Sequence, residues 1–263
     1  TFGANAVLEV PIVKQKSPEK GSSTLILSVK NSYLEQSSKV FYDYIDEDGL
    51  PFNFMDIYGK VSINAANGSK LSLFGFNFTD QVNNYKSISD FGWNSYGGGA
   101  NFVVIPGKSP VLIEGRFAYS EYNSKINSSN RSSSIGGFNG GLDFTYFIGK
   151  DVFKYGLEVE GYSTDYELVN FVGSKIEQSE NTTQLGLYFK YKSILGKFII
   201  EPGLRIQWYA SLAEVSPEPR LAVKYNASDR LRFKFAGGMY SQNLISASSD
   251  RDVVNLFSGF LSG

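Results

Sequence analysis

Apolar and polar residues alternate along long stretches of this 263-residue chain. Between residues 198 and 208, one set of alternate positions is apolar: Phe198, Ile200, Leu204, Ile206 and Trp208. The positions on the other face are charged, polar or small: Glu201, Gly203, Arg205 and Gln207. The same pattern recurs in residues 138–148, 153–160, 184–192 and 231–240. Because side chains of a β-strand point alternately to its two faces, this period of two predicts strands with one apolar and one polar face.

The connections between these strands fall into a short class and a long class. The short ones have the Gly, Asn, Asp or Pro residues that tight hairpins require: Asn67-Gly68-Ser69, Pro106-Gly107-Lys108, Gly149-Lys150-Asp151, Leu195-Gly196-Lys197 and Asn226-Ala227-Ser228-Asp229. The longer polar segments lie near residues 34–52, 79–92, 121–134, 163–180, 210–219 and 242–263. Of these, residues 123–134 are almost all Ser, Asn, Lys or Arg and are expected to form a mobile loop. The spacing predicts an all-β, antiparallel up-and-down meander of about twelve strands.

Alternation alone does not show whether the apolar face is packed inside a soluble domain or exposed to lipid. Three features favour an outer-membrane β-barrel with the polar set in its lumen. The strands have about ten residues, the length of a tilted membrane crossing. The connections are short at one end and long at the other, as periplasmic turns and extracellular loops are. Aromatic residues gather at strand ends, as in an interfacial girdle: Tyr146, Phe147, Phe153, Trp208 and Tyr209.

Two places depart from this pattern. Leu112 falls on the otherwise polar face of its strand, and residues 71–74 depart from strict alternation, which suggests a β-bulge.

Composition excludes several classes of function. The chain has 25 basic and 26 acidic residues, so no basic excess indicates nucleic acid as a partner. It has no cysteine and no histidine, which removes thiolate chemistry, the usual general base and the commonest metal ligand. No compact carboxylate or lysine site replaces them. We therefore expect no enzyme activity, no catalytic residue, no cofactor and no metal.

Two local motifs resemble ligand sites and are better explained otherwise. The acidic run at Asp43, Asp46, Glu47 and Asp48 fails the EF-hand spacing, so a solvated external loop is the preferred interpretation. The glycine runs at 97–99 and 136–141 fit no phosphate-binding pattern, and we expect strand glycines at bends and beneath aromatic rings.

Charged residues on the polar face are the candidate functional residues. We expect them to face the lumen as a polar wall of cross-strand pairs, with a specific ligand site or transport path as the alternative. The candidates are Glu114, Arg116, Asp143, Glu158, Glu160, Lys190, Glu201, Arg205, Lys224 and Arg232.

Several segments resemble TonB-dependent outer-membrane receptors, particularly those of Bacteroidetes-type bacteria. They are residues 25–35, 54–61, 71–74, 201–205, 216–225 and 235–242. The resemblance implies a barrel of about 22 strands that holds a plug domain. It also implies a TonB box that couples uptake to the proton-motive force across the inner membrane. In that family the plug supplies much of the ligand site, so no binding residue is carried over to this chain.

The sequence therefore predicts that residues 1–263 are part of such a barrel, without the plug domain and the C-terminal strands. The leading hypothesis is TonB-dependent uptake of a small-molecule, glycan or peptide ligand across the outer membrane. The expected partners are outer-membrane lipid, the plug domain, the TonB system and, as in some relatives, a surface lipoprotein. A non-transporting structural or adhesion barrel, alone or within a larger surface or secretion complex, is the alternative. A barrel enzyme is a third, disfavoured by the lack of histidine.

Overall fold

A computed structural model describes residues 3–262 except 18, 43–48, 83–89, 108, 127–130, 170–171, 243 and 248–258. Twelve strands form one sheet: β1 (Gly3–Val13), β2 (Ser22–Ser32), β3 (Phe52–Asn64), β4 (Lys70–Val82), β5 (Phe91–Val104), β6 (Val111–Ile126), β7 (Arg131–Ile148), β8 (Asp151–Val169), β9 (Lys175–Leu195), β10 (Phe198–Tyr209), β11 (Glu214–Asn226) and β12 (Arg232–Gly238). A separate short hairpin contains β13 (Leu244–Ala247) and β14 (Gly259–Ser262).

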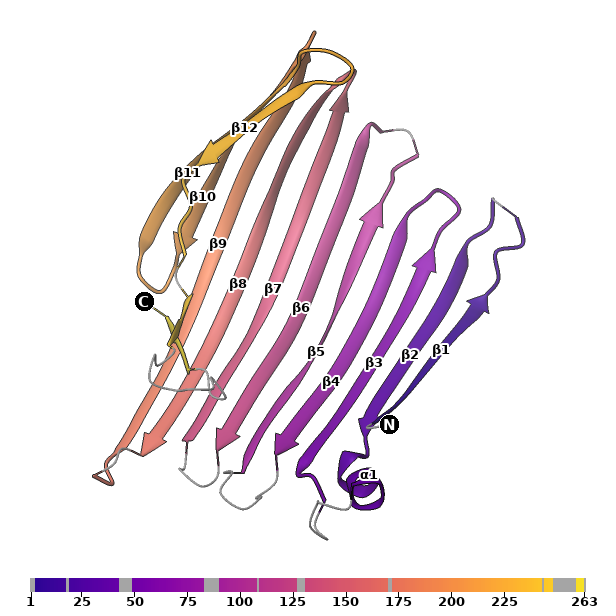
Figure 1. The fold of residues 1–263 in the computed structure, drawn as a ribbon. Coiled ribbons are helices and arrows are strands. Elements are labelled where there is room, and N and C mark those ends of the chain that lie inside the picture. Colours follow the sequence, from indigo (N-terminus) through magenta and orange to yellow (C-terminus); the bar gives the residue numbers. More distant parts are fainter. Residues whose placement is uncertain are drawn as a thin grey trace.

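Each strand of the large sheet pairs with its neighbours in sequence, in the order β1 to β12. Every one of these pairings is antiparallel, so the sheet is a continuous up-and-down meander (Figure 1). This confirms the predicted fold class. The sheet curves without closing on itself, and its two edges are β1 and β12.

The predicted short turns connect the strands at one end of the sheet. Gly68, Gly149 and Gly196 have φ angles of +86°, +62° and +60°. Because glycine has no Cβ, it adopts this left-handed conformation at little cost, which explains its place in these turns.

Several strands extend further toward the long-loop end than the sequence pattern predicts. β7, β8 and β9 have 18, 19 and 21 residues. Most of residues 121–134 and 163–180, expected to form loops, is therefore strand, and that expectation was wrong. The half of each strand nearer the short turns has an apolar convex face. In the half nearer the long loops both faces are mainly polar, so alternation disappears while backbone pairing continues.

The connection from β2 to β3 contains a short helix, α1 (Leu34–Phe41). No other helix is present among the described residues. The Ser38 side chain is fully buried there. Its Oγ donates to the carbonyl of Glu35 at 3.1 Å and accepts the N–H of Leu50 at 2.8 Å. Within the described ranges, no helix has the length and apolarity needed to cross a membrane.

The two faces of the sheet differ as predicted. A single cavity is lined by residues from every strand between β6 and β12, so the polar face is concave. The convex face carries exposed apolar side chains such as Leu187, Leu204 and Phe235. Among the described residues, Tyr209 is the only large hydrophobic side chain that is buried, so this wall has almost no apolar core. A soluble domain with the apolar set packed inside is therefore not the observed arrangement.

Strand register also corrects three local expectations. Residues 70–82 pair without interruption on both sides, so the expected bulge near Phe74 does not exist. Phe147 and Tyr209 occupy concave-face positions, so they do not belong to a lipid-facing girdle. Tyr209 is only 6% exposed, and its hydroxyl group donates to Ser241 Oγ at 2.8 Å.

Candidate functional site

All ten sequence-predicted residues occupy concave-face positions, because strand pairing places them in register with one another. The structure brings seven of them to one cavity or its edge: Glu114, Arg116, Asp143, Glu158, Lys190, Glu201 and Arg205. Glu160 belongs to a neighbouring hydrogen-bonded cluster. Lys224 and Arg232 lie outside the cavity, close to the turn between β11 and β12.

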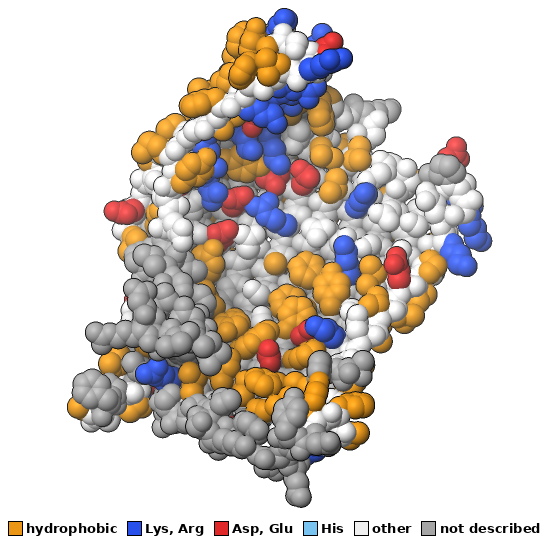
Figure 2. Space-filling model, viewed as in Figure 1, with side chains coloured by type: hydrophobic (Ala, Val, Ile, Leu, Met, Phe, Trp, Pro, Cys, Tyr) orange, Lys and Arg blue, Asp and Glu red, His pale blue; other side chains and the backbone are white. Residues whose placement is uncertain are grey.

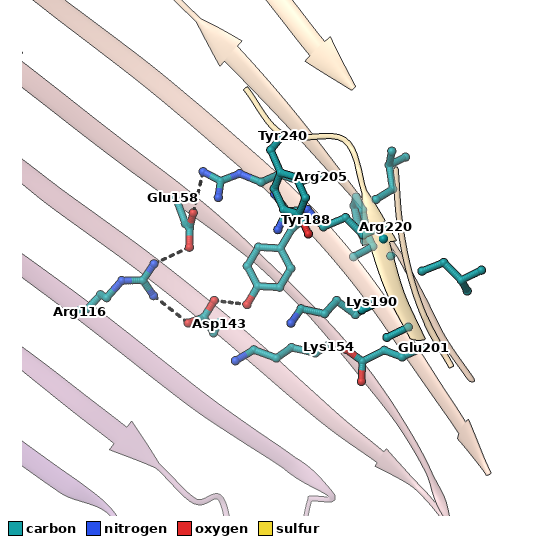
Figure 3. A pocket seen from close by; sticks show the side chains of 17 residues that line it. Arg116, Asp143, Lys154, Glu158, Tyr188, Lys190, Glu201, Arg205, Arg220 and Tyr240 are labelled. Atoms are coloured by element: carbon teal, nitrogen blue, oxygen red, sulfur yellow. Dashed lines mark hydrogen bonds and ion pairs between the residues drawn. The ribbon is translucent and has the colours of Figure 1, made fainter. Parts of the chain in front are cut away.

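The centre of the site is a chain of ion pairs across β6 to β10 (Figure 3). Arg116 donates to Asp143 at 2.9 Å and to Glu158 at 2.5 Å. The second oxygen of Glu158 lies 3.0 Å from Nη2 of Arg205. The hydroxyl group of Tyr188 donates to Asp143. Glu158 and Asp143 side chains are only 17% and 10% exposed, so the contacts with their partners offset the cost of removing these carboxylates from water.

Glycines make room for this network on the strands beneath it. At Gly141 a Cβ atom would lie 2.6 Å from the guanidinium carbon of Arg116. At Gly156 it would lie 2.8 Å from the Tyr188 ring. The long side chains can therefore lie across the neighbouring strand and reach their partners. The predicted position of strand glycines beneath aromatic rings is confirmed at Gly97 and Gly99, which lie next to the rings of Phe76 and Phe74, whereas Gly141 lies beneath a guanidinium group.

A second polar cluster lies beside the first, toward the long-loop end. Glu160 accepts hydrogen bonds from Asn139 at 2.6 Å, from Tyr162 at 2.8 Å and from Gln184. These hydrogen-bond partners are all uncharged, while Arg205 and Arg220 line the same pocket. Alternation could have identified Asn139 and Gln184, but a search for charged residues passed over them.

The cavity beside the first cluster has a volume of about 450 Å³ and includes residues from the far side of the curved sheet. Arg220 of β11 contacts Glu218 at 2.5 Å, and its guanidinium group lies 4.6 Å from the ring centre of Tyr240. Lys154 of β8 lies 3.5 Å from Glu114. Of these five residues, only Glu114 was among the candidates. Alternation along residues 153–160 and 231–240 places Lys154 and Tyr240 on the polar face, so the sequence pattern could have added both.

An aromatic patch lies on the concave face of β4, β5 and the long-loop half of β6. Phe74, Phe76 and Phe78 share this face, and the last two rings stack with centroids 4.9 Å apart. Trp93 and Tyr122 continue the patch, with centroids 5.8 Å apart. Figure 2 shows the division: charged side chains gather on the upper part of the face in view, and apolar ones nearer the long loops. The sequence pattern missed this patch because it looked like a break in alternation.

No group of three or more acidic residues suited to a metal ion exists among the described residues. The acidic run at residues 43–48 lies outside them.

Comparison of the sequence finds no matching family model and no matching curated protein. Solved structures do match. The FrpB iron transporter of Neisseria meningitidis has a TM-score of 0.63 at 10% identity, and the match covers 94% of this chain and 44% of that one. A mutant of the ferric enterobactin receptor PfeA of Pseudomonas aeruginosa has a TM-score of 0.60 at 8% identity, covering 94% and 42%. The outer-membrane transporter YddB of Escherichia coli has a TM-score of 0.56 at 11% identity, covering 86% and 36%.

The fold is therefore that of the β-barrel wall of outer-membrane transporters, and the chain spans less than half the length of each matched structure. This confirms the predicted fold, that of an outer-membrane β-barrel wall. The resemblance to TonB-dependent receptors is confirmed at the level of the fold.

Proposed function

We propose that this chain forms part of the wall of a TonB-dependent receptor that takes up a nutrient ligand across the outer membrane. The observation that carries the proposal is the network of ion pairs on the concave face of a transporter fold. A half-buried charged wall is stable beside a hydrated lumen, whereas lipid contact requires the apolar convex face. On this proposal all ten candidate residues face the lumen.

The proposed path has two sections. A ligand entering from the long-loop end meets the aromatic patch around Phe76 and Trp93 first. It then reaches the charged cavity around Arg116 and Arg205, nearer the short turns. Aromatic faces support contacts with planar or apolar groups, and charged side chains orient polar ones. This sequence of surfaces favours ligand passage over a purely structural or adhesive role, and transport over catalysis.

The whole receptor would contain parts beyond this chain. We propose a barrel of about 22 strands, of which residues 1–263 supply twelve, with a plug domain and a TonB box elsewhere in the protein. Two of the matched proteins are called an iron transporter and a ferric enterobactin receptor. Ferric chelates are therefore the first ligands to test, followed by oligosaccharides and oligopeptides. A surface lipoprotein remains a proposed partner.

Uptake by cells tests this function. Cells that express the parent protein should accumulate at least one labelled ferric chelate, oligosaccharide or oligopeptide, and an isogenic strain without TonB should not. The empty vector serves as the control. Equal accumulation with and without TonB would contradict energy coupling. No accumulation of any member of the panel would favour the non-transporting barrel.

A further inference from the structure

Two lysines face each other directly across the pair β8–β9 on the concave face. Lys154 and Lys190 are register partners, and both line the cavity of about 450 Å³. Side chains of direct cross-strand partners begin about 5 Å apart, and like charges at such positions destabilise a sheet. Figure 3 shows the two lysine side chains running next to each other. This arrangement needs a negative charge nearby to be stable.

Two of the carboxylates around the lysines, Asp143 and Glu158, are already engaged with other groups. Asp143 accepts from Arg116 and Tyr188, and Glu158 is shared by Arg116 and Arg205. These contacts use the two carboxylates closest to the centre of the cavity.

The remaining carboxylates offset the lysine charges only partly. Glu114 lies 3.5 Å from Lys154, a longer contact than those of the arginines. Lys190 forms no ion pair within the described chain, and its Nζ lies 6.0 Å from the ring centre of Tyr188. Glu201 lines the same cavity without an ion pair to any described residue. Among the described residues, the ammonium group of Lys190 is therefore left without a carboxylate in direct contact, beside a second cation.

We propose that Lys154 and Lys190 bind an oxyanion, a carboxylate or phosphate group, of the transported ligand. The two ammonium groups supply up to six N–H donors from adjacent strands. An anion between them would replace repulsion by two charge-assisted hydrogen bonds. Arg220, which is paired with Glu218 and lies over Tyr240 in the same cavity, offers a further guanidinium group to the rest of the ligand. This inference rests on the proposed function and names the chemical class of its ligand.

Binding of simple anions to the purified parent receptor tests the inference. Inorganic phosphate and succinate are titrated by calorimetry at constant ionic strength, because salt screens exposed charges. We expect Lys154→Gln and Lys190→Gln each to weaken binding of at least one anion by tenfold or more. Lys60→Gln is the matched control, since Lys60 lies on the concave face of β3 outside the cavity. It should change the affinity by less than twofold.

A second readout distinguishes a ligand anion from a carboxylate supplied by another part of the parent protein. In anion-free buffer, Lys190→Gln should leave the unfolding temperature unchanged or raise it, because it removes repulsion. A lower unfolding temperature would show that a protein carboxylate already neutralises Lys190, and would overturn the inference. Failure of the folded receptor to bind either anion, or equal losses in all three variants, would overturn it too. Anion binding needs no TonB, so a receptor that binds anions without transporting would reject the proposed function alone.

Discussion

At the scale of single residues, the site depends on small side chains beneath large ones. Arg116 reaches Asp143 and Glu158 because Gly141 leaves its path free. Tyr188 reaches Asp143 across Gly156 for the same reason. Glycine lowers intrinsic strand stability, and here the hydrogen bonds and ion pairs that it permits offset that cost.

Substitution of Gly156 by alanine tests this role. The new Cβ would lie 2.7 Å from the carbonyl oxygen of Leu142 and 2.8 Å from the Tyr188 ring. Since the backbone atom cannot swing away, we expect the free energy of unfolding to fall by about 1–3 kcal/mol. Unfolding by denaturant in lipid vesicles measures the change. Gly107→Ala is the control, because its Cβ would meet no atom within 4 Å, and equal losses in both variants would contradict the explanation.

At the scale of elements, the strand pairs are fixed at the short-turn end by side chains as well as by backbone hydrogen bonds. Asp151 begins β8 directly after the turn at Gly149. Its carboxylate accepts the N–H of Ile194 at 3.0 Å, the Tyr191 hydroxyl at 2.7 Å and the Ser193 hydroxyl at 3.3 Å. These contacts connect the start of β8 to the end of β9.

The same contacts predict a pH dependence. The Ile194 N–H, followed by the Tyr191 hydroxyl, lowers the pKa of Asp151 below its ordinary value of 3.8. A lowered folded-state pKa means that the stabilisation is present above pH 3.8 and is lost as the pH falls through the folded value. Asp151→Asn should therefore unfold at a lower temperature than the native receptor at pH 7, and the difference should vanish in acid. A difference that persists in acid would show that the charge of Asp151 is not its cause.

At the scale of the whole molecule, curvature decides which face each residue serves. The apolar set lies on the convex side and the charged set on the concave side, the reverse of a soluble barrel. Leu204 is 40% exposed on the convex face, and its neighbour Arg205 lies in the ion-pair network. Adjacent residues of β10 therefore meet different solvents.

Spin labels at positions 204 and 205 of the parent receptor in vesicles test this assignment. Dissolved oxygen, which concentrates in the bilayer, should relax the label at 204 more strongly than the label at 205. A water-soluble nickel complex should show the opposite preference. Since the chain contains no cysteine, each introduced cysteine is a unique attachment site within it. Shielding of position 204 from both reagents would place it in a protein core and contradict a lipid-facing wall.

The alternation of apolar and polar residues determined the strands, the two faces and the meander, because each strand has to satisfy lipid on one side and polar groups on the other. Turn glycines such as Gly149 determined where the short connections fall. The same pattern failed where both faces are polar, beyond the apolar band, and where aromatic residues such as Phe76 face inward. In both cases the two faces of the strand have similar polarity, so alternation between apolar and polar residues cannot be recognised.

Only the tertiary structure decided which of the concave-face charges act together. Arg116 and Glu158 are 42 residues apart in the sequence. Their contact depends on the register of three strands and on Gly141, over which the Arg116 side chain passes. The direct opposition of Lys154 and Lys190 depends equally on register, because a shift of one residue would turn one lysine to the lipid face. The contact between Tyr240 and Arg220 likewise depends on the register of the chain after β12 against β11. Sequence alone therefore specified the wall, because the pattern within each strand shows which face is apolar and which is polar. Pairing across strands and the curvature of the sheet specified the site, because they decide which polar side chains meet.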